Sequence, residues 1–355
     1  MSRGRLSRRG FLDHMTAAAL GGAIGGTKAA EGFFPDAGQP AYTVREEADA
    51  IFIETPRLEA AIRKRGYVSG VAAQSFLDKQ TGFRDPGFGL DIADWIMEPG
   101  SDEAYRDQLA GTDLVYEYNN LFHGRRAKRS IEGPQICTQA RELQPVVIQG
   151  KDFVAIKQQF TYRVAAPGKK VGSVWTQVLV FPVDRRYFFS MDRIDTVNRS
   201  DAMFLRIDMP GHIRHRGGDT FAQIYLSYRG HIPSSEFLHD FPPDEKFDYL
   251  RDRDPVPERF IRACQLRDPQ TGRVGPWLAG MTLEPSVVYE AWCHQRGYVC
   301  MIQEFGGRPI EPGQAFSAAF IVGYFDSIEE MHEVYDRYKG HIGLVVTDQG
   351  WQLVR

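Results

Sequence analysis

The sequence predicts a mainly β protein, built as one large antiparallel domain with a few short helices. Extended segments follow one another at short spacing from Asp49 onward, and helical patterns are few. Strands do not alternate with helices in the βαβ manner, which argues against a parallel sheet. The hydrophobic content of 43% and the aromatic content of 12% are sufficient for a large buried core. We therefore expect an antiparallel sandwich or barrel.

The first 29 residues have the pattern of a twin-arginine export signal. Arg8 and Arg9 lie in the motif SRRGFL at residues 7–12, and a weakly apolar run over 15–26 follows. That run is too short and too glycine-rich for a membrane-spanning helix, and Ala29 is the expected cleavage site. A chance arginine pair is the alternative, but Phe and Leu follow at the required offsets. We expect periplasmic or secreted protein without a stable membrane anchor.

After the signal, residues 30–48 are expected to form a tether and residues 49–355 a single domain. The tether is rich in Gly, Pro and Ala, and no later linker divides the chain. Strands are expected over 51–53, 58–63, 68–77, 146–148, 153–164, 173–183, 187–194, 286–294, 298–304 and 316–325. In 153–164 the apolar face consists of Val154, Ile156, Phe160, Tyr162 and Val164, interrupted by Gln158.

Three short helices are expected, over 102–110, 257–266 and 327–338. The second would hold Pro257 in its first turn, where proline is tolerated. The third has the clearest signals, because Ser327 can cap it and Glu330 completes a capping box ahead of an apolar stripe.

The formal net charge is −3, and removal of residues 1–29 would leave −7, because that segment holds five basic groups and one acid. This balance excludes a general nucleic-acid binder. No nucleophile elbow, phosphate-binding loop or dinucleotide fingerprint is present, so no cofactor is indicated. The four cysteines are too few for a disulfide scaffold, and Cys293 and Cys300 either bond across a hairpin or remain two buried thiols.

Three stretches of sequence together resemble one known superfamily. Residues 51–82 give two strands, a glycine-marked strand and FLDKQTG; residues 195–201 give DTVNRSD, followed by an apolar strand and His212; residues 298–304 give YVCMIQE before a later PG turn. The pattern resembles the galactose-mutarotase-like β-supersandwich superfamily, which contains aldose epimerases, polysaccharide lyases and glycoside hydrolases. The resemblance implies a β-supersandwich with His212 and Glu304 as catalytic residues. The Tyr-Phe-Asn that follows the epimerase histidine is absent here, which argues against a simple epimerase.

The densest polar cluster is His212, Arg214, His215 and Arg216. On a strand, the residues at 212, 214 and 216 would share one face, with His215 on the other. The imidazoles can transfer a proton near neutral pH, and the guanidiniums can hold a carboxylate through paired hydrogen bonds. A solvated loop and a divalent metal site at the two histidines are the alternatives.

Further candidates lie elsewhere along the chain. Glu304 is a carboxylate in an apolar strand, where its pKa would be raised, or alternatively an outward-facing polar position. His123 precedes Gly124 and a basic run that includes Arg126, which would form a positive rim or an ordinary exposed loop. The remaining candidates are Gln135 for a sugar hydroxyl, Trp292 for stacking on a sugar ring, and Tyr225 as a general base.

These features together predict an exported carbohydrate-active enzyme. The arginine cluster favours a lyase that cleaves an acidic, uronate-containing oligo- or polysaccharide by β-elimination. The alternatives are a glycoside hydrolase with Glu304 and Asp219 as paired carboxylates, a mutarotase or epimerase with His212 and Glu304, and a glycan-binding protein without catalytic activity.

Overall fold

The computed structural model describes residues 41–109, 111–112, 114, 126–242, 245–295 and 297–355. Residues 40–355 form one compact unit. The expected export signal, with Arg8, Arg9 and Ala29, lies outside the described residues. The expected tether contains ordered structure, since β1 (Thr43–Glu46) pairs with β2 (Ala50–Glu54). Among the described residues, no helix has the length and apolarity needed to span a bilayer.

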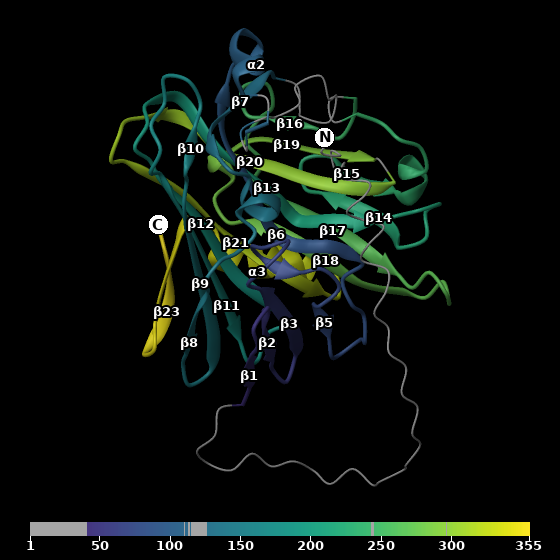
Figure 1. Cartoon of the computed structure of the whole chain (residues 1–355). Helices are drawn as coiled ribbons and strands as arrows, with labels where there is room; N and C mark the ends of the chain where they lie inside the picture. The colour runs from purple at the N-terminus through teal and green to yellow at the C-terminus, as the bar shows by residue number, and fades with distance from the viewer. Residues whose placement is uncertain (1–40, 110, 113, 115–125, 243–244, 296) are drawn as a thin grey trace, which may run out of the picture. The chain divides into compact units, whose positions relative to one another are not determined.

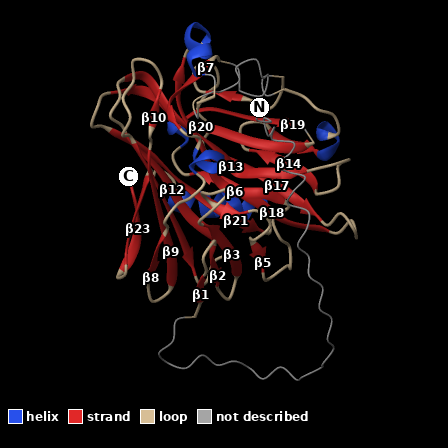
Figure 2. Ribbon diagram, viewed as in Figure 1, coloured by secondary structure: helices blue, strands red, loops and turns tan. Residues whose placement is uncertain are grey.

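The described residues form a mainly β structure in which every strand pairing is antiparallel, as the sequence predicts. Two large sheets dominate (Figures 1 and 2). The eight-stranded sheet has the order β10 (Val164–Ala165), β7 (Lys128–Gly133), β6 (Gly87–Pro99), β13 (Ser200–Arg214), β20 (Tyr298–Ile310), β19 (Val288–Gln295) and β16 (Tyr249–Leu250), with β4 (Val71–Ala72) paired to β6.

The nine-stranded sheet has the order β15 (Gly230–Pro233), β14 (Phe221–Leu226), β17 (Phe260–Arg267), β18 (Val274–Thr282), β21 (Ala315–Phe325), β12 (Tyr187–Asp195), β11 (Val174–Pro182), β9 (Phe153–Thr161) and β8 (Val146–Gln149). Two small sheets consist of β1, β2, β3 (Leu58–Arg63) and β5 (Leu77–Asp78), and of β22 (Gly343–Thr347) and β23 (Gly350–Val354). The helical segments are η1 (Glu103–Tyr105), α2 (Arg106–Leu109), η2 (Ile136–Ala140), η3 (Ser234–Phe237), η4 (Pro285–Val287) and α3 (Ile328–Tyr338).

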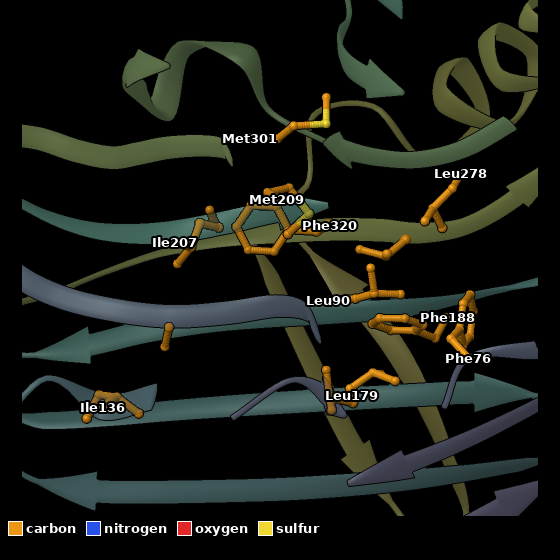
Figure 3. Packing of buried hydrophobic residues seen from close by; sticks show 14 of the residues in the cluster. Phe76, Leu90, Ile136, Leu179, Phe188, Ile207, Met209, Leu278, Met301 and Phe320 are labelled. Atoms are coloured by element: carbon orange, nitrogen blue, oxygen red, sulfur yellow. The ribbon is translucent and has the colours of Figure 1, made fainter. Parts of the chain in front are cut away.

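The largest apolar core is built from both large sheets. Leu90 and Ile207 belong to the eight-stranded sheet, whereas Leu179, Phe188 and Phe320 belong to the nine-stranded sheet (Figure 3). Full burial of each such side chain stabilises the fold by about 1.5–3 kcal/mol. Four residues of the face predicted in 153–164 join this core: Val154, Ile156, Phe160 and Tyr162. Val164 does not, because β9 ends at Thr161 and Val164 belongs to β10 in the eight-stranded sheet. The interruption, Gln158, is also buried and donates to Gln177 Oε1 at 3.1 Å.

Helix α3 is confirmed, including its cap. Ser327 Oγ accepts a hydrogen bond from the Glu330 N–H at 3.1 Å, while Glu330 Oε2 accepts from the N–H of Asp326 at 2.6 Å. The buried face of α3 joins a second core with the nine-stranded sheet. The helix expected over 102–110 is present as the short segments η1 and α2.

The helix expected over 257–266 is wrong, because this segment forms strand β17. Ile261 and Ala263 pack into the second core, whereas Cys264 and Leu266 pack into the first. A strand that is buried on both faces has no polar alternation, so its pattern does not distinguish it from a buried helix.

The four cysteines are free, buried thiols, and the alternative of a bond between Cys293 and Cys300 is wrong. Cys293 is opposite Met301 and faces the core between the sheets, whereas Cys300 is opposite His294 and packs beside Trp292. Successive strand residues point to opposite faces, and this separates the two sulfur atoms.

Candidate active site

One face of the eight-stranded sheet carries an unusual number of polar side chains. The opposite face contributes Leu205 and Phe305 to the core between the sheets. By alternation, the polar face receives Arg206 of β13, Glu304 of β20 and Glu290 of β19, which are direct neighbours in the strand register.

These residues form a buried four-charge cluster with Lys128 of β7. Arg206 Nη2 and Nε lie 2.6 and 2.9 Å from Glu304 Oε1, and Lys128 Nζ lies 2.7 Å from Glu304 Oε2. Lys128 Nζ also contacts Glu290 Oε2. The Trp292 ring lies beside both cations, 4.8 Å from Lys128 Nζ and 5.0 Å from Arg206 Cζ. Two positive and two negative groups therefore balance within one apolar layer.

The cluster neutralises the carboxylate that the sequence marked as catalytic. Burial raises the pKa of Glu304, and the charges of Lys128 and Arg206 oppose that rise. For Lys128, burial lowers the pKa, but the charges of Glu304 and Glu290 outweigh it and leave the pKa raised. The pKa of Glu304 stays raised overall, as the sequence predicts, because burial outweighs the two cations. However, Arg206 contacts one carboxylate oxygen and Lys128 the other, and the side chain is fully buried, so neither oxygen faces a ligand. We therefore assign Glu304 to the stability and shape of this face.

A second group of residues lies where β6, β13 and β20 end near Gly87, Arg214 and Tyr298. His212 Nε2 lies 3.0 Å from Asp208 Oδ1, and its ring lies 5.4 Å from that of Tyr298. The Asp208–His212 contact is a charge contact, since neither atom has a well-aligned hydrogen bond.

This group continues through an aromatic pair to a cation. The Tyr298 and Phe88 rings meet edge to face at 5.2 Å, and Arg214 Cζ lies 4.6 Å from the centre of the Phe88 ring. We call Phe88, Asp208, His212, Arg214 and Tyr298 the basic edge. His212 is 8% exposed, whereas Phe88, Arg214 and Tyr298 are half-buried. A ligand would therefore meet two aromatic rings and a guanidinium before the imidazole.

Glycines set the spacing of the strands beside His212. A Cβ on Gly87 would collide with the carbonyl oxygen of His212, and one on Gly211 would collide with the carbonyl oxygen of Gly89. Only glycine fits at these positions without moving β6 away from β13. The register also shifts between Asp208 and His212, which brings these two side chains together.

The electrostatics of the basic edge favour a protonated His212. Burial lowers its pKa, but Asp208 and Cys300 outweigh that effect and hold the pKa well above its ordinary value. The raised pKa favours the imidazolium, which is the form that can donate a proton. Arg214 Nε is buried and has no hydrogen-bond partner among the described residues, while the side chain as a whole is half-buried.

Two other residues of the predicted histidine cluster lie away from this edge. His215 is 1% exposed and stacks on Phe221 at 3.8 Å, while burial lowers its pKa to about 4. Arg216 does not extend the strand: it lies exposed in the turn after β13, where its N–H donates to Asp219 Oδ1 at 3.1 Å. The expected shared face therefore ends at Arg214.

The remaining candidates are dispersed. Tyr225 belongs to the nine-stranded sheet, where its hydroxyl lies 3.0 Å from His332 Nε2. Gln135 is buried and donates to Asp94. Arg126 contacts the Tyr289 hydroxyl at 3.1 Å and Asp252 at 2.9 Å.

The basic run was expected to form a positive rim, but Lys128 is fully buried in the four-charge cluster and does not contribute to one. His123 lies outside the described residues. Trp292 is fully buried and its indole N–H has no hydrogen-bond partner among them.

His212 and Glu304 share a face but not a reacting centre. His212 is paired with Cys300, which is four residues from Glu304 along β20. At about 3.3 Å per residue, this places them roughly 13 Å apart along the strand. Sequence reasoning missed Asp208 and Tyr298, although the alternation of β20 places residue 298 on the same face as residue 304.

No group of three or more His, Cys, Asp or Glu side chains is arranged to hold a metal ion in the part of the chain that the structure describes. The histidine pair proposed as an alternative metal site does not converge, since His212 contacts Asp208 on one face and His215 stacks on Phe221 on the other.

Comparison with known proteins gives structural likeness only. No family model matches the chain, and no curated protein matches it. The solved structures it resembles include galactose 1-epimerase from Lactobacillus acidophilus, with 9% identity, a TM-score of 0.40 and coverage of 81% of this chain and 98% of that one. A galactose mutarotase-like protein from Clostridium acetobutylicum has 9% identity and a TM-score of 0.38, with coverage of 81% of this chain and 98% of that one.

A 4-alpha-glucanotransferase from Thermococcus litoralis has 10% identity and a TM-score of 0.34, with coverage of 80% of this chain and 39% of that one. One of these neighbours is named as an epimerase, one as a mutarotase-like protein and one as a glucanotransferase. At such scores the superpositions are loose, so the chemistry of the site is argued from this chain's own residues.

Proposed function

We infer that this protein is an exported enzyme that cleaves an acidic glycan by β-elimination at the basic edge. The observation that carries this proposal is the contact of His212 with Asp208 beside an arginine whose Nε has no partner among the described residues. Export is supported by the arginine pair and apolar run at the N-terminus.

The edge has the groups that recognition of a uronate requires. Arg214 can hold the sugar carboxylate through charge-assisted hydrogen bonds, and this neutralisation makes the neighbouring C5 proton more acidic. The half-buried rings of Phe88 and Tyr298 offer apolar surfaces for the faces of sugar rings. The substrate is therefore proposed to be an anionic oligo- or polysaccharide.

The reaction uses one proton acceptor and one proton donor. Tyr298 acts as a phenolate and becomes a phenol by taking the C5 proton, the C4–O4 bond breaks, and the electron pair of the C5–H bond forms the C4=C5 double bond. The His212 imidazolium gives its proton to the departing O4, and Asp208 stabilises the imidazolium beforehand. Exchange with water restores both groups. The scheme uses no cofactor, and an EDTA arm in the assay tests the alternative of a divalent metal.

The other enzyme candidates receive less support. A hydrolase with Glu304 and Asp219 would need a free carboxylate pair, but Glu304 is held by Lys128 and Arg206. A mutarotase with His212 and Glu304 would need both groups at one ring, but they are separated along β20. A glycan-binding protein without catalytic activity remains as an outcome of the test.

The purified protein is incubated with polyuronates and neutral polysaccharides. We expect new ultraviolet absorbance from an unsaturated uronate, at least about a hundredfold reduced in His212→Gln, since a positioned acid contributes about 10²–10⁴-fold. His231→Gln is the control, because this histidine is exposed and hydrogen-bonded to Gln223 in the other sheet. Reducing ends without absorbance would mean hydrolysis, and binding without either product would mean a binding protein.

Export is tested separately. We expect Arg8→Lys with Arg9→Lys to retain the protein in the cytoplasm, measured by cell fractionation. Unchanged export of this variant would refute the proposed signal.

A further inference from the structure

A shallow hollow lies at the end of the two large sheets, beside the basic edge. Its volume is about 190 Å³, and its wall includes Phe83, Arg84, Pro86, Thr220, Arg267 and Arg273. Three of these side chains are guanidiniums, which is a high density of positive charge for a protein whose net charge is −3.

Backbone carbonyls hold two of the guanidiniums in place. Arg267 Nη1 donates to the carbonyl oxygen of Gly218 at 3.2 Å. Arg273 donates to the carbonyl oxygen of Thr81 at 3.4 and 3.3 Å, and its Cζ lies 4.3 Å from the centre of the Phe83 ring. Neutral carbonyls orient these groups without cancelling their charge, and the remaining N–H groups are pre-organised for an anion.

The acid in the wall of the hollow, Asp268, is held mainly by backbone N–H groups, with a smaller charge interaction with Arg273. Asp268 accepts hydrogen bonds from the N–H groups of Gln270 and Thr271 at 2.8 and 3.2 Å, and these hold its pKa below the ordinary value. Arg84 contacts Glu59 at 3.4 Å, a pair in which both side chains are about 40% exposed and therefore weakly coupled. Three arginines and one aspartate leave the wall with an excess of two positive charges.

The hollow adjoins the basic edge through two backbone contacts. The carbonyl oxygen of Pro86 accepts from the Arg214 N–H at 3.3 Å, and the Thr220 hydroxyl donates to the carbonyl oxygen of Arg214. Both Pro86 and Thr220 line the hollow. A chain of acidic sugars seated at the basic edge can therefore extend into it.

We propose that this arginine hollow is a second subsite that binds the carboxylate of an adjacent uronate unit. The proposal rests on the function proposed above and deepens it: the substrate is an oligomer with charged groups on neighbouring units, rather than a single acidic sugar. Arg267 and Arg273 bind the carboxylate, and the Phe83 ring packs against the Arg273 guanidinium.

The test measures binding of tetragalacturonate and tetramannuronate to the full chain by calorimetry, with cellotetraose as the neutral comparison. We expect Arg267→Gln with Arg273→Gln to raise Kd for the bound uronate about tenfold or more, because charge-assisted hydrogen bonds are about twice as strong as neutral ones. KM should rise in parallel with kcat nearly unchanged. Methyl esterification of the oligomer should remove the difference between wild type and variant.

Arg45→Gln is the matched control, because Arg45 lies 4.3 Å from the Phe52 ring but lines no part of the hollow. Thermal unfolding checks that each variant is folded, and the single variant Arg273→Gln replaces the double variant if that one is not. A Kd equal to that of wild type, or no binding of either uronate by wild type, overturns the subsite. Binding that the double variant loses, without turnover by wild type, would refute the lyase and support the subsite.

Discussion

Removal of the Lys128 ammonium tests the role of the four-charge cluster. In Lys128→Met, Glu290 and Glu304 remain buried and lose the ammonium that contacts both of them, while Arg206 still contacts Glu304. Breaking a buried ion pair in this way costs about 3–5 kcal/mol of unfolding free energy, because a carboxylate is left uncompensated. We expect a loss of that size at pH 7, measured by urea unfolding with tryptophan fluorescence as a lower midpoint at constant m.

The loss should depend on pH and on the partner charge. Burial raises the pKa of Glu304, so without Lys128 the carboxylate takes up a proton as the pH falls, and the loss should be smaller at pH 5 than at pH 7. Lys128→Met combined with Glu290→Gln restores neutrality and should be more stable than the single variant.

An exposed pair provides the comparison for this experiment. Lys79 lies 2.6 Å from Glu54, with the two side chains 26% and 56% exposed. Because solvent screens such a pair, Lys79→Met should cost less than about 1 kcal/mol. A Lys128→Met loss no larger than this, or a double variant no more stable than the single one, would refute the assignment.

Three further predictions concern groups elsewhere in the domain. Burial and then the neighbouring Asp91 charge raise the pKa of Asp192 well above its ordinary value. The folded protein therefore binds a proton more tightly than the unfolded protein, and stability falls as the pH rises above about 4. Asp192→Asn should flatten this decline in urea midpoints between pH 4 and 7, whereas Asp195→Asn, at an exposed side chain, should not. Asp208→Asn removes a charge that raises the pKa of His212, so the alkaline limb of kcat/KM should move down by about one pH unit or more; an unmoved limb would exclude His212 as the acid. All four thiols are buried and free, so Ellman's reagent should react with four groups in guanidinium chloride and with few in native protein, and fewer than four after denaturation would indicate a disulfide.

The sequence predicted some strands that are buried on both faces, such as those expected over 173–183 and 286–294, but it missed β6 and gave β17 as a helix. The 153–164 face and α3 carried complete signals, an apolar period and a cap, and both are present, the face without Val164. Strand β6 was not predicted, because both of its faces are buried and its interior holds Asp91 and Asp94, which resemble loop residues in a sequence. Tertiary burial, which local patterns do not encode, decided these segments.

The candidate site was predictable only where its residues are close in sequence. His212 and Arg214 were found together because the alternation of one strand places them on one face. Asp208 reaches His212 through a register shift, and Tyr298 arrives from a strand more than eighty positions later. Neither contact follows from spacing. The same limit explains Glu304, whose buried surroundings were foreseen but whose two cations come from β7 and β13.

The four-charge cluster and the basic edge lie on the same face but differ in how completely their charges are compensated. This difference separates a structural role from a catalytic one. In the four-charge cluster every ion has an opposite charge within hydrogen-bond distance and is at most 2% exposed, so the charges compensate one another out of reach of a ligand. At the basic edge, His212 has one carboxylate beside it, and the neighbouring guanidinium has an unpartnered Nε among the described residues and is half-buried. A bound anion can therefore stabilise the basic edge but not the four-charge cluster. Binding of an anionic substrate should therefore stabilise the protonated form of His212 at the basic edge, while leaving the four-charge cluster unaffected.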